Sequence, residues 1–106
     1  MNFKLRQLEG FIAVAEGRSF SAAADRLFMT QPAFSQLIKE LETVVGTRLF
    51  DRTTRKVELT EAGRVLFAQS HRPLEDLQHA YQSVSELASG RRGSVSIRYC
   101  LRQLSV

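Results

Sequence analysis

Cysteine and histidine are scarce in this chain of 106 residues, which has one cysteine, Cys100, and two histidines, His71 and His79. A single cysteine excludes an internal disulfide framework and favours a reducing compartment. The two histidines are eight positions apart, so they form no metal-binding pair, and neither zinc nor another metal is expected. No glycine-rich phosphate loop, dinucleotide fingerprint or nucleophile elbow is present, so we expect no cofactor and no enzyme.

Long apolar runs are also missing. No stretch reaches the roughly 18 apolar residues that a membrane-spanning helix needs. The first six residues carry two basic side chains, Lys4 and Arg6, but no apolar centre of a secretory signal follows them. We therefore expect no membrane partner and a cytoplasmic location. The length and the 43% apolar composition fit one compact globular domain with an extension.

Positive charge is only in small excess, with fifteen Lys and Arg against eleven Asp and Glu, a net charge of +4. Much of this excess lies in residues 90–106, which carry four arginines and no acid. Residues 1–60 carry nine basic and seven acidic side chains. A basic balance permits binding to polyanions without proving it, so an argument for nucleic acid depends on local placement in the first sixty residues.

Apolar residues at helical spacing predict three helices, over about 4–16, 20–27 and 31–45. Gly17 is the expected stop of the first helix. Thr30 is the expected N-cap of the third. Two short helices joined by a few residues, the second opening on a cap, are typical of a helix-turn-helix.

The pattern then changes to two short strands, 48–52 and 56–59, joined by a hairpin tip at 53–55. A long helix follows from Glu61 to about Ala88, and Thr60 is its expected N-cap. The predicted fold is mainly α: a winged helix-turn-helix, with a three-helix core and a two-stranded wing, followed by a long dimerisation helix.

Three segments are expected. The winged helix-turn-helix domain occupies 1–60, the linker or dimerisation helix occupies 61–89, and 90–106 is a basic tail that we expect to be disordered. Pro73 lies inside the long helix and should kink or loosen it.

The third helix has two faces when its residues are placed at about 100° intervals. Its polar face carries Pro32, Ser35, Gln36, Lys39 and Thr43. Short amides and hydroxyls can reach base edges in a major groove, where glutamine bonds adenine and a methyl group packs on thymine. The same angles fit a core helix whose outer surface is simply neutral and solvated, and the pattern alone does not separate the two.

Basic side chains follow the third helix at or near the hairpin tip, namely Arg52, Arg55 and Lys56. Arginine at such a tip can enter a minor groove or pair with phosphates, although surface turns are polar in any case. Ser21 and Thr30 lie at helix starts, where hydroxyl and backbone N–H groups suit phosphate oxygens. Plain helix capping is the alternative for both.

The long helix carries an apolar stripe with alternating spacings of three and four. The predicted dimer interface comprises Phe67, Leu74, Leu77, Tyr81, Val84 and Ala88. A helix of nearly thirty residues cannot bury such a stripe on so small a body, so pairing with a second copy is expected. Folding back onto its own core is the alternative.

Residues of about 3–65 resemble the N-terminal winged helix-turn-helix of LysR-type bacterial transcriptional regulators. The matching segments are Leu8–Glu16, Ser19–Leu27, Thr30–Glu42, Gly46–Arg52 and Leu59–Gly63. The resemblance implies a sequence-specific transcriptional regulator that binds an inverted-repeat promoter site in double-stranded DNA as a homodimer. The long helix resembles the linker helix of that family, which pairs between subunits.

The resemblance also assigns roles. The positions that meet bases or nearby phosphates are Gln31, Pro32, Ala33, Ser35 and Gln36. Arg55 matches the wing position that reaches the minor groove, and Ser21, Lys39 and Arg52 match phosphate contacts. Gln36 stands where the family often has arginine, so this position has lost a cation.

Family members carry a C-terminal effector-binding domain and can form tetramers. Here Val95–Ile97 look like the first strand of that domain, whereas residues 98–106 do not continue it. A truncated or non-native end is expected, and no small-molecule effector is expected for this chain. The rival functions are a dimeric protein-interaction module, which DNA footprinting would distinguish, and a small enzyme, for which no motif is found.

Overall fold

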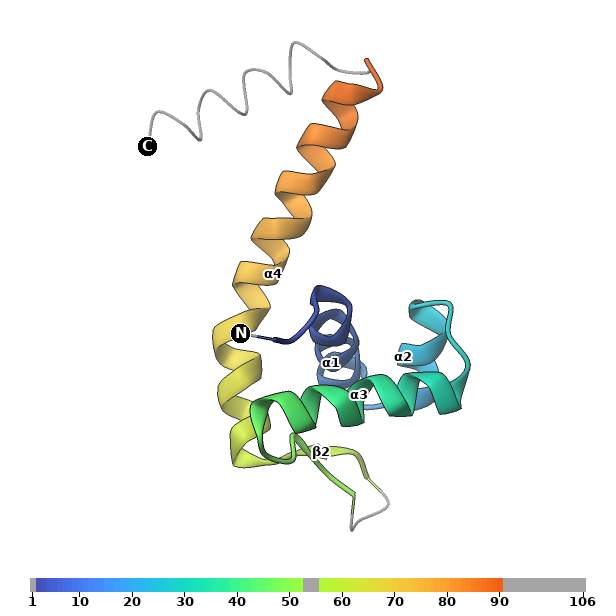
Figure 1. The fold of residues 1–106 in the computed structure, drawn as a ribbon, viewed down its shortest axis with the longest axis vertical. Coiled ribbons are helices and arrows are strands. Elements are labelled where there is room, and N and C mark those ends of the chain that lie inside the picture. Colours follow the sequence, from blue (N-terminus) through green and yellow to red (C-terminus); the bar gives the residue numbers. More distant parts are fainter. Residues whose placement is uncertain (1, 53–55, 91–106) are drawn as a thin grey trace. The chain divides into compact units, whose positions relative to one another are not determined.

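The structure is a computed structural model that describes residues 2–52 and 56–90. The described residues form four helices and one antiparallel hairpin (Figure 1). The helices are α1 (Leu5–Gly17), α2 (Phe20–Arg26), α3 (Gln31–Val45) and α4 (Glu61–Ala88). The strands are β1 (Phe50–Asp51) and β2 (Glu58–Leu59), with Phe50 opposite Leu59. The predicted mainly helical winged helix-turn-helix is confirmed, although both strands are shorter than expected.

The chain divides into two compact units, Met1–His71 and Arg72–Val106. The first unit contains the three short helices, the hairpin and the beginning of α4, so it extends past the predicted boundary at residue 60. Of the second unit, residues 72–90 are described. The helix α4 is unbroken at Pro73, so a kink there remains a prediction, as do the segment boundaries. Residues 91–106 of the predicted tail lie outside the described part.

Local capping determines where α3 begins and ends. The Thr30 hydroxyl accepts a hydrogen bond from the Ala33 N–H, at 3.4 Å, as expected for an N-cap. At the other end Gly46 adopts a left-handed backbone with φ of 83°. The expected stop at Gly17 is wrong by one residue, because Gly17 is still helical and Arg18 takes the left-handed conformation, with φ of 56°.

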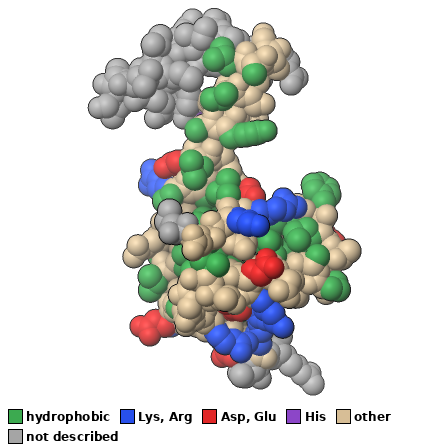
Figure 2. Space-filling model, viewed as in Figure 1, with side chains coloured by type: hydrophobic (Ala, Val, Ile, Leu, Met, Phe, Trp, Pro, Cys, Tyr) green, Lys and Arg blue, Asp and Glu red, His purple; other side chains and the backbone are tan. Residues whose placement is uncertain are grey.

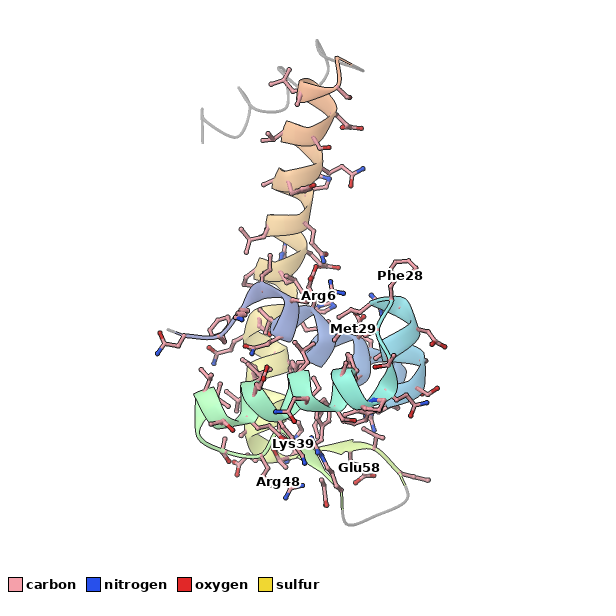
Figure 3. All side chains as sticks on the ribbon, turned by 45° about the vertical axis from the view of Figure 1, so that its right-hand side comes forward. Arg6, Phe28, Met29, Lys39, Arg48 and Glu58 are labelled. Atoms are coloured by element: carbon pink, nitrogen blue, oxygen red, sulfur yellow. The ribbon has the colours of Figure 1, made fainter. Side chains whose placement is uncertain are left out.

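The turn between α2 and α3 is a Schellman motif with a phenylalanine where glycine is usual. The Met29 N–H donates to the Ala24 carbonyl at 2.9 Å, and the Phe28 N–H donates to the Asp25 carbonyl at 3.0 Å. Phe28 has φ of 57° and its surface is 96% exposed. Its side chain projects from the turn (Figure 3). The backbone therefore closes the turn without any packing from this ring.

Four phenylalanine rings form the centre of the first unit. Phe20 lies 5.9 Å from Phe34 and 5.4 Å from Phe50 between ring centroids, and Phe11 lies 5.4 Å from Phe50. These rings come from α1, α2, α3 and β1, so the same cluster holds the helix-turn-helix and the start of the hairpin. Gly10 lets α1 approach α3, because a Cβ there would lie 3.0 Å from Phe34 Cε1.

Thr60 joins the base of the hairpin to the start of α4. Its hydroxyl accepts from the Gly63 N–H at 3.1 Å, which caps the helix as predicted. The same hydroxyl donates to the Arg48 carbonyl at 2.6 Å, and the Thr60 N–H donates to the Leu49 carbonyl at 3.0 Å. Two hydrogen bonds thus hold the entry of the hairpin against Thr60, and the third caps the first turn of α4.

Candidate nucleic-acid interface

The first two turns of α3 present the predicted base-contacting residues together at the surface. Gln31, Pro32, Ala33 and Gln36 are exposed, and Ser35 is half-buried. The opposite face of α3 is buried in the core through Phe34, Ile38 and Leu41. Helix α3 is therefore anchored along one side, and its free side offers amide, hydroxyl and methyl groups without an acidic residue in these turns.

The candidate phosphate contacts differ in how free their polar atoms are. Ser21 on α2 and Lys39 on α3 are exposed. The oxygen of Thr30 accepts the capping bond described above, which leaves its hydroxyl hydrogen to donate. Figure 3 shows Lys39 and Arg48 on the side of α3 where the hairpin lies, and Figure 2 shows basic side chains gathered on this part of the surface. Cations beside a neutral polar helix face suit a groove flanked by phosphates.

Arg52 is held by protein groups at the start of the wing. Its Nη2 lies 3.1 Å from Glu42 Oε1, and its guanidinium lies 5.4 Å from the centroid of the Phe20 ring. Its side chain is 29% exposed. A phosphate contact by Arg52 remains a prediction, but the structure gives this side chain partners within the fold that the sequence did not reveal.

A shallow pocket of about 230 Å³ lies between α3 and the hairpin. Ser35 from α3, with Arg52 and Lys56 from the hairpin, are among its lining residues. The polar face of α3 and the hairpin strands therefore border the same pocket. Arg55, the predicted minor-groove residue, lies outside the described residues.

The predicted dimer stripe on α4 is exposed only in part. Leu77, Tyr81 and Val84 are 56%, 70% and 61% exposed, and Ala88 is exposed too. Leu74 is buried, and Phe67 is half-buried with its ring 4.9 Å from that of His71. The exposed apolar positions follow spacings of four, three and four, which is the pattern of a helix-pairing seam.

No metal site and no membrane span are found within residues 2–52 and 56–90. No three histidine, cysteine or acidic side chains gather there as metal ligands. None of the helices in this part of the chain has the length and apolar character needed to cross a bilayer.

The sequence pattern of bacterial regulatory helix-turn-helix proteins of the lysR family matches residues 5–64. The chain belongs to the LysR family. Its helix-turn-helix and hairpin are the DNA-binding domain of this family, as the resemblance implied.

Individual LysR-family proteins match most of the chain. It is 40% identical over 97 residues to the regulator YfeR of Shigella flexneri, covering 92% of this chain and 32% of that protein. It is 45% identical over 94 residues to the transcriptional regulator BudR of Klebsiella aerogenes, covering 89% and 66%. These relatives are named as transcriptional regulators, which agrees with the expectation of a non-enzyme. The chain spans about a third of the length of YfeR.

A solved LysR-family structure matches the fold. The DNA-binding domain of BenM in complex with catB site 1 DNA superposes with a TM-score of 0.73 at 33% identity. The match covers 85% of this chain and all of that one. The arrangement of helices and hairpin is therefore similar to that of a domain that was crystallised in complex with DNA.

Proposed function

We propose that the chain is a sequence-specific regulator that binds double-stranded DNA, with α3 in the major groove and the hairpin tip at the adjacent minor groove. The single observation that carries this proposal is the exposed, acid-free polar face in the first two turns of α3, which is fixed to the core on its other side. The crystal structure of the similar BenM domain in complex with DNA supports DNA binding.

The proposed roles follow the surface just described. The residues proposed to meet bases or nearby phosphates are Gln31, Pro32, Ala33, Ser35 and Gln36. Arg55 is proposed to reach the minor groove, and the proposed phosphate contacts are Ser21, Thr30, Lys39 and Arg52. Side chains at base edges determine which sequence is preferred, whereas phosphate contacts strengthen binding to any sequence.

The experiment is selection of binding sites from random duplex DNA, followed by affinity measurements on single base-pair variants of the selected site. We expect Gln31→Ala to relax the preference at one base pair by about 1–3 kcal/mol. Gln69→Ala, which removes an exposed glutamine from α4, is the matched control and should leave every preference unchanged. Equal base preferences for wild type and Gln31→Ala would refute the role of Gln31, and failure to select any site would refute the function.

We also propose a homodimer that pairs through α4. Leu77, Tyr81 and Val84 expose apolar surface along one seam, and burial in a helix pair would remove it from water. A two-fold dimer binds two half-sites of an inverted repeat, about one or two helical turns apart. The supporting observation is the exposure of this seam in the single chain.

Two valines of α4 allow a matched test of dimerisation. Val84 is on the seam and 61% exposed, whereas Val65 is off the seam and 53% exposed. We expect Val84→Lys to weaken self-association at least about tenfold, because an ammonium group would have to be desolvated in the seam. Val65→Lys should sediment like wild type. A wild-type chain that is monomeric at concentrations well above those used for DNA binding would refute the homodimer.

The role of the chain in transcription is also a proposal, because the chain spans about a third of the length of YfeR. We propose that binding controls transcription of nearby promoters, which would take place in the cytoplasm, where the bacterial chromosome lies. Effector sensing and tetramer formation are not proposed for these residues.

A further inference from the structure

Glu42 is an acidic side chain on the helix that we propose to read DNA. A carboxylate near phosphates is repelled unless it is engaged by donors within the protein. The Glu42 side chain is only 11% exposed, so it points away from solvent. Its hydrogen bonds show what it does there.

Both oxygens of Glu42 bind the beginning of the hairpin. Oε2 accepts from the Leu49 N–H at 2.8 Å and from the Phe50 N–H at 3.4 Å. Oε1 accepts from Nη2 of Arg52 at 3.1 Å. One carboxylate on α3 therefore holds three of the four residues from Leu49 to Arg52, including two backbone groups.

The same segment is fixed from its other side. The Leu49 carbonyl accepts from the N–H of Thr60, the N-cap of α4, at 3.0 Å. The N–H of Leu49 is therefore held by α3, and its carbonyl is held by the cap of α4. The Phe50 ring is fully buried against the phenylalanine cluster. The orientation of β1 is therefore fixed by the core, and the hydrogen bonds of Glu42 fix it relative to α3.

We propose that Glu42 is a positioning residue that fixes the hairpin strands relative to the recognition helix without touching DNA itself. This inference rests on the proposed function. In a complex with DNA, Glu42 would set the distance between the minor-groove contact of the hairpin and the base pairs that α3 contacts. Loss of the carboxylate would loosen the hairpin while leaving the polar face of α3 in place, so DNA recognition would fail selectively at the outer base pairs.

The test compares Glu42→Gln with Glu40→Gln in the full chain. Glu40 is an exposed acid on the same helix, so both variants remove one negative charge from α3. A pure charge effect, including release of Arg52 from Glu42, would change the overall DNA affinity and leave the preferences at individual base pairs as in wild type. A positioning effect would appear in Glu42→Gln alone.

The readout is affinity for the selected site and for versions with single base-pair changes at the centre and at the flank of each half-site. For wild type and Glu40→Gln we expect a loss of about fivefold or more at both places, the lower end for one mismatched pair. For Glu42→Gln we expect the central loss to persist and the flanking loss to fall below about twofold. Equal flanking losses in all three proteins would overturn the inference, whereas absence of any site preference in wild type would overturn the proposed function instead.

A second measurement uses wild type and does not depend on how a variant folds. Amide hydrogen exchange should be slow at Leu49 and Phe50, because both N–H groups are bound by the carboxylate. Exchange at both positions as fast as in an unfolded peptide would overturn the inference even if Glu42→Gln did not fold.

Discussion

Gly63 in the first turn of α4 has less room for a side chain than the other glycines of the described residues, and adding one methyl group there should be strongly destabilising. A Cβ at Gly63 would lie 2.2 Å from the Leu49 carbonyl oxygen and 2.9 Å from Leu59 Cδ2. The Leu49 backbone cannot yield easily, since Thr60 holds its carbonyl and Glu42 holds its N–H. We expect Gly63→Ala to lower the free energy of unfolding by about 2–3 kcal/mol, near the upper end for overpacking.

The assay is thermal unfolding followed by circular dichroism. For a domain of this size, each kcal/mol shifts Tm by about 4–8 °C, so Gly63→Ala should lose at least about 8 °C. Gly17→Ala is the matched control, because nothing lies within 4 Å of a Cβ there and the residue is helical. It should be neutral or more stable by up to about 1 kcal/mol. A Tm for Gly63→Ala within about 2 °C of wild type would refute the close approach of α4 to the hairpin.

Two further predictions concern the helix-turn-helix and its contact with α4. Phe28→Gly should stabilise the fold by about 0.5–1 kcal/mol, because it removes the cost of a left-handed phenylalanine and loses no buried surface. Phe28→Ala keeps the left-handed strain and should therefore melt like wild type. A lower Tm for Phe28→Gly than for wild type in the same melting assay would contradict this prediction. His71 Nε2 lies 2.9 Å from Glu16 Oε2, with side chains 34% and 37% exposed, so a double-mutant cycle with alanine should give a coupling below about 1 kcal/mol. A coupling above about 2 kcal/mol would contradict this prediction, because it would exceed the stabilisation expected of an ion pair with this much solvent exposure.

The sequence predicted the parts of the fold that depend on neighbours along the chain. The bounds of α3 were predicted correctly, since Thr30 caps its start and Gly46 ends it. The angular separation of its faces agrees with the burial of Phe34, Ile38 and Leu41, whereas Val44 and Val45 at the end of the apolar face are exposed. The helix α4 was found for the same reason, with Thr60 as its cap. These signals are local, so they can be read without a structure.

The parts that sequence reasoning missed depend on contacts between distant segments. Glu42 and Arg52 are ten positions apart and meet only because the hairpin folds back to α3. Helical spacing assigned no role to Glu42, although an acid on a groove-reading helix was a signal that it needed a partner. The left-handed backbone of Phe28 could not be predicted from the sequence either, because bulky side chains rarely adopt this conformation. The strands were overestimated because alternation continues beyond the two paired positions on each side.

The central claim is that the free face of α3 reads a defined DNA sequence. The most direct measurement is a fluorescence anisotropy titration of the whole chain on a duplex carrying the selected inverted repeat and on a duplex with the same bases shuffled, both at the same near-physiological salt concentration. The account predicts at least about tenfold tighter binding to the repeat, a difference of about 1.4 kcal/mol, and loss of part of that difference in Gln31→Ala. Equal affinity for the two duplexes would contradict it.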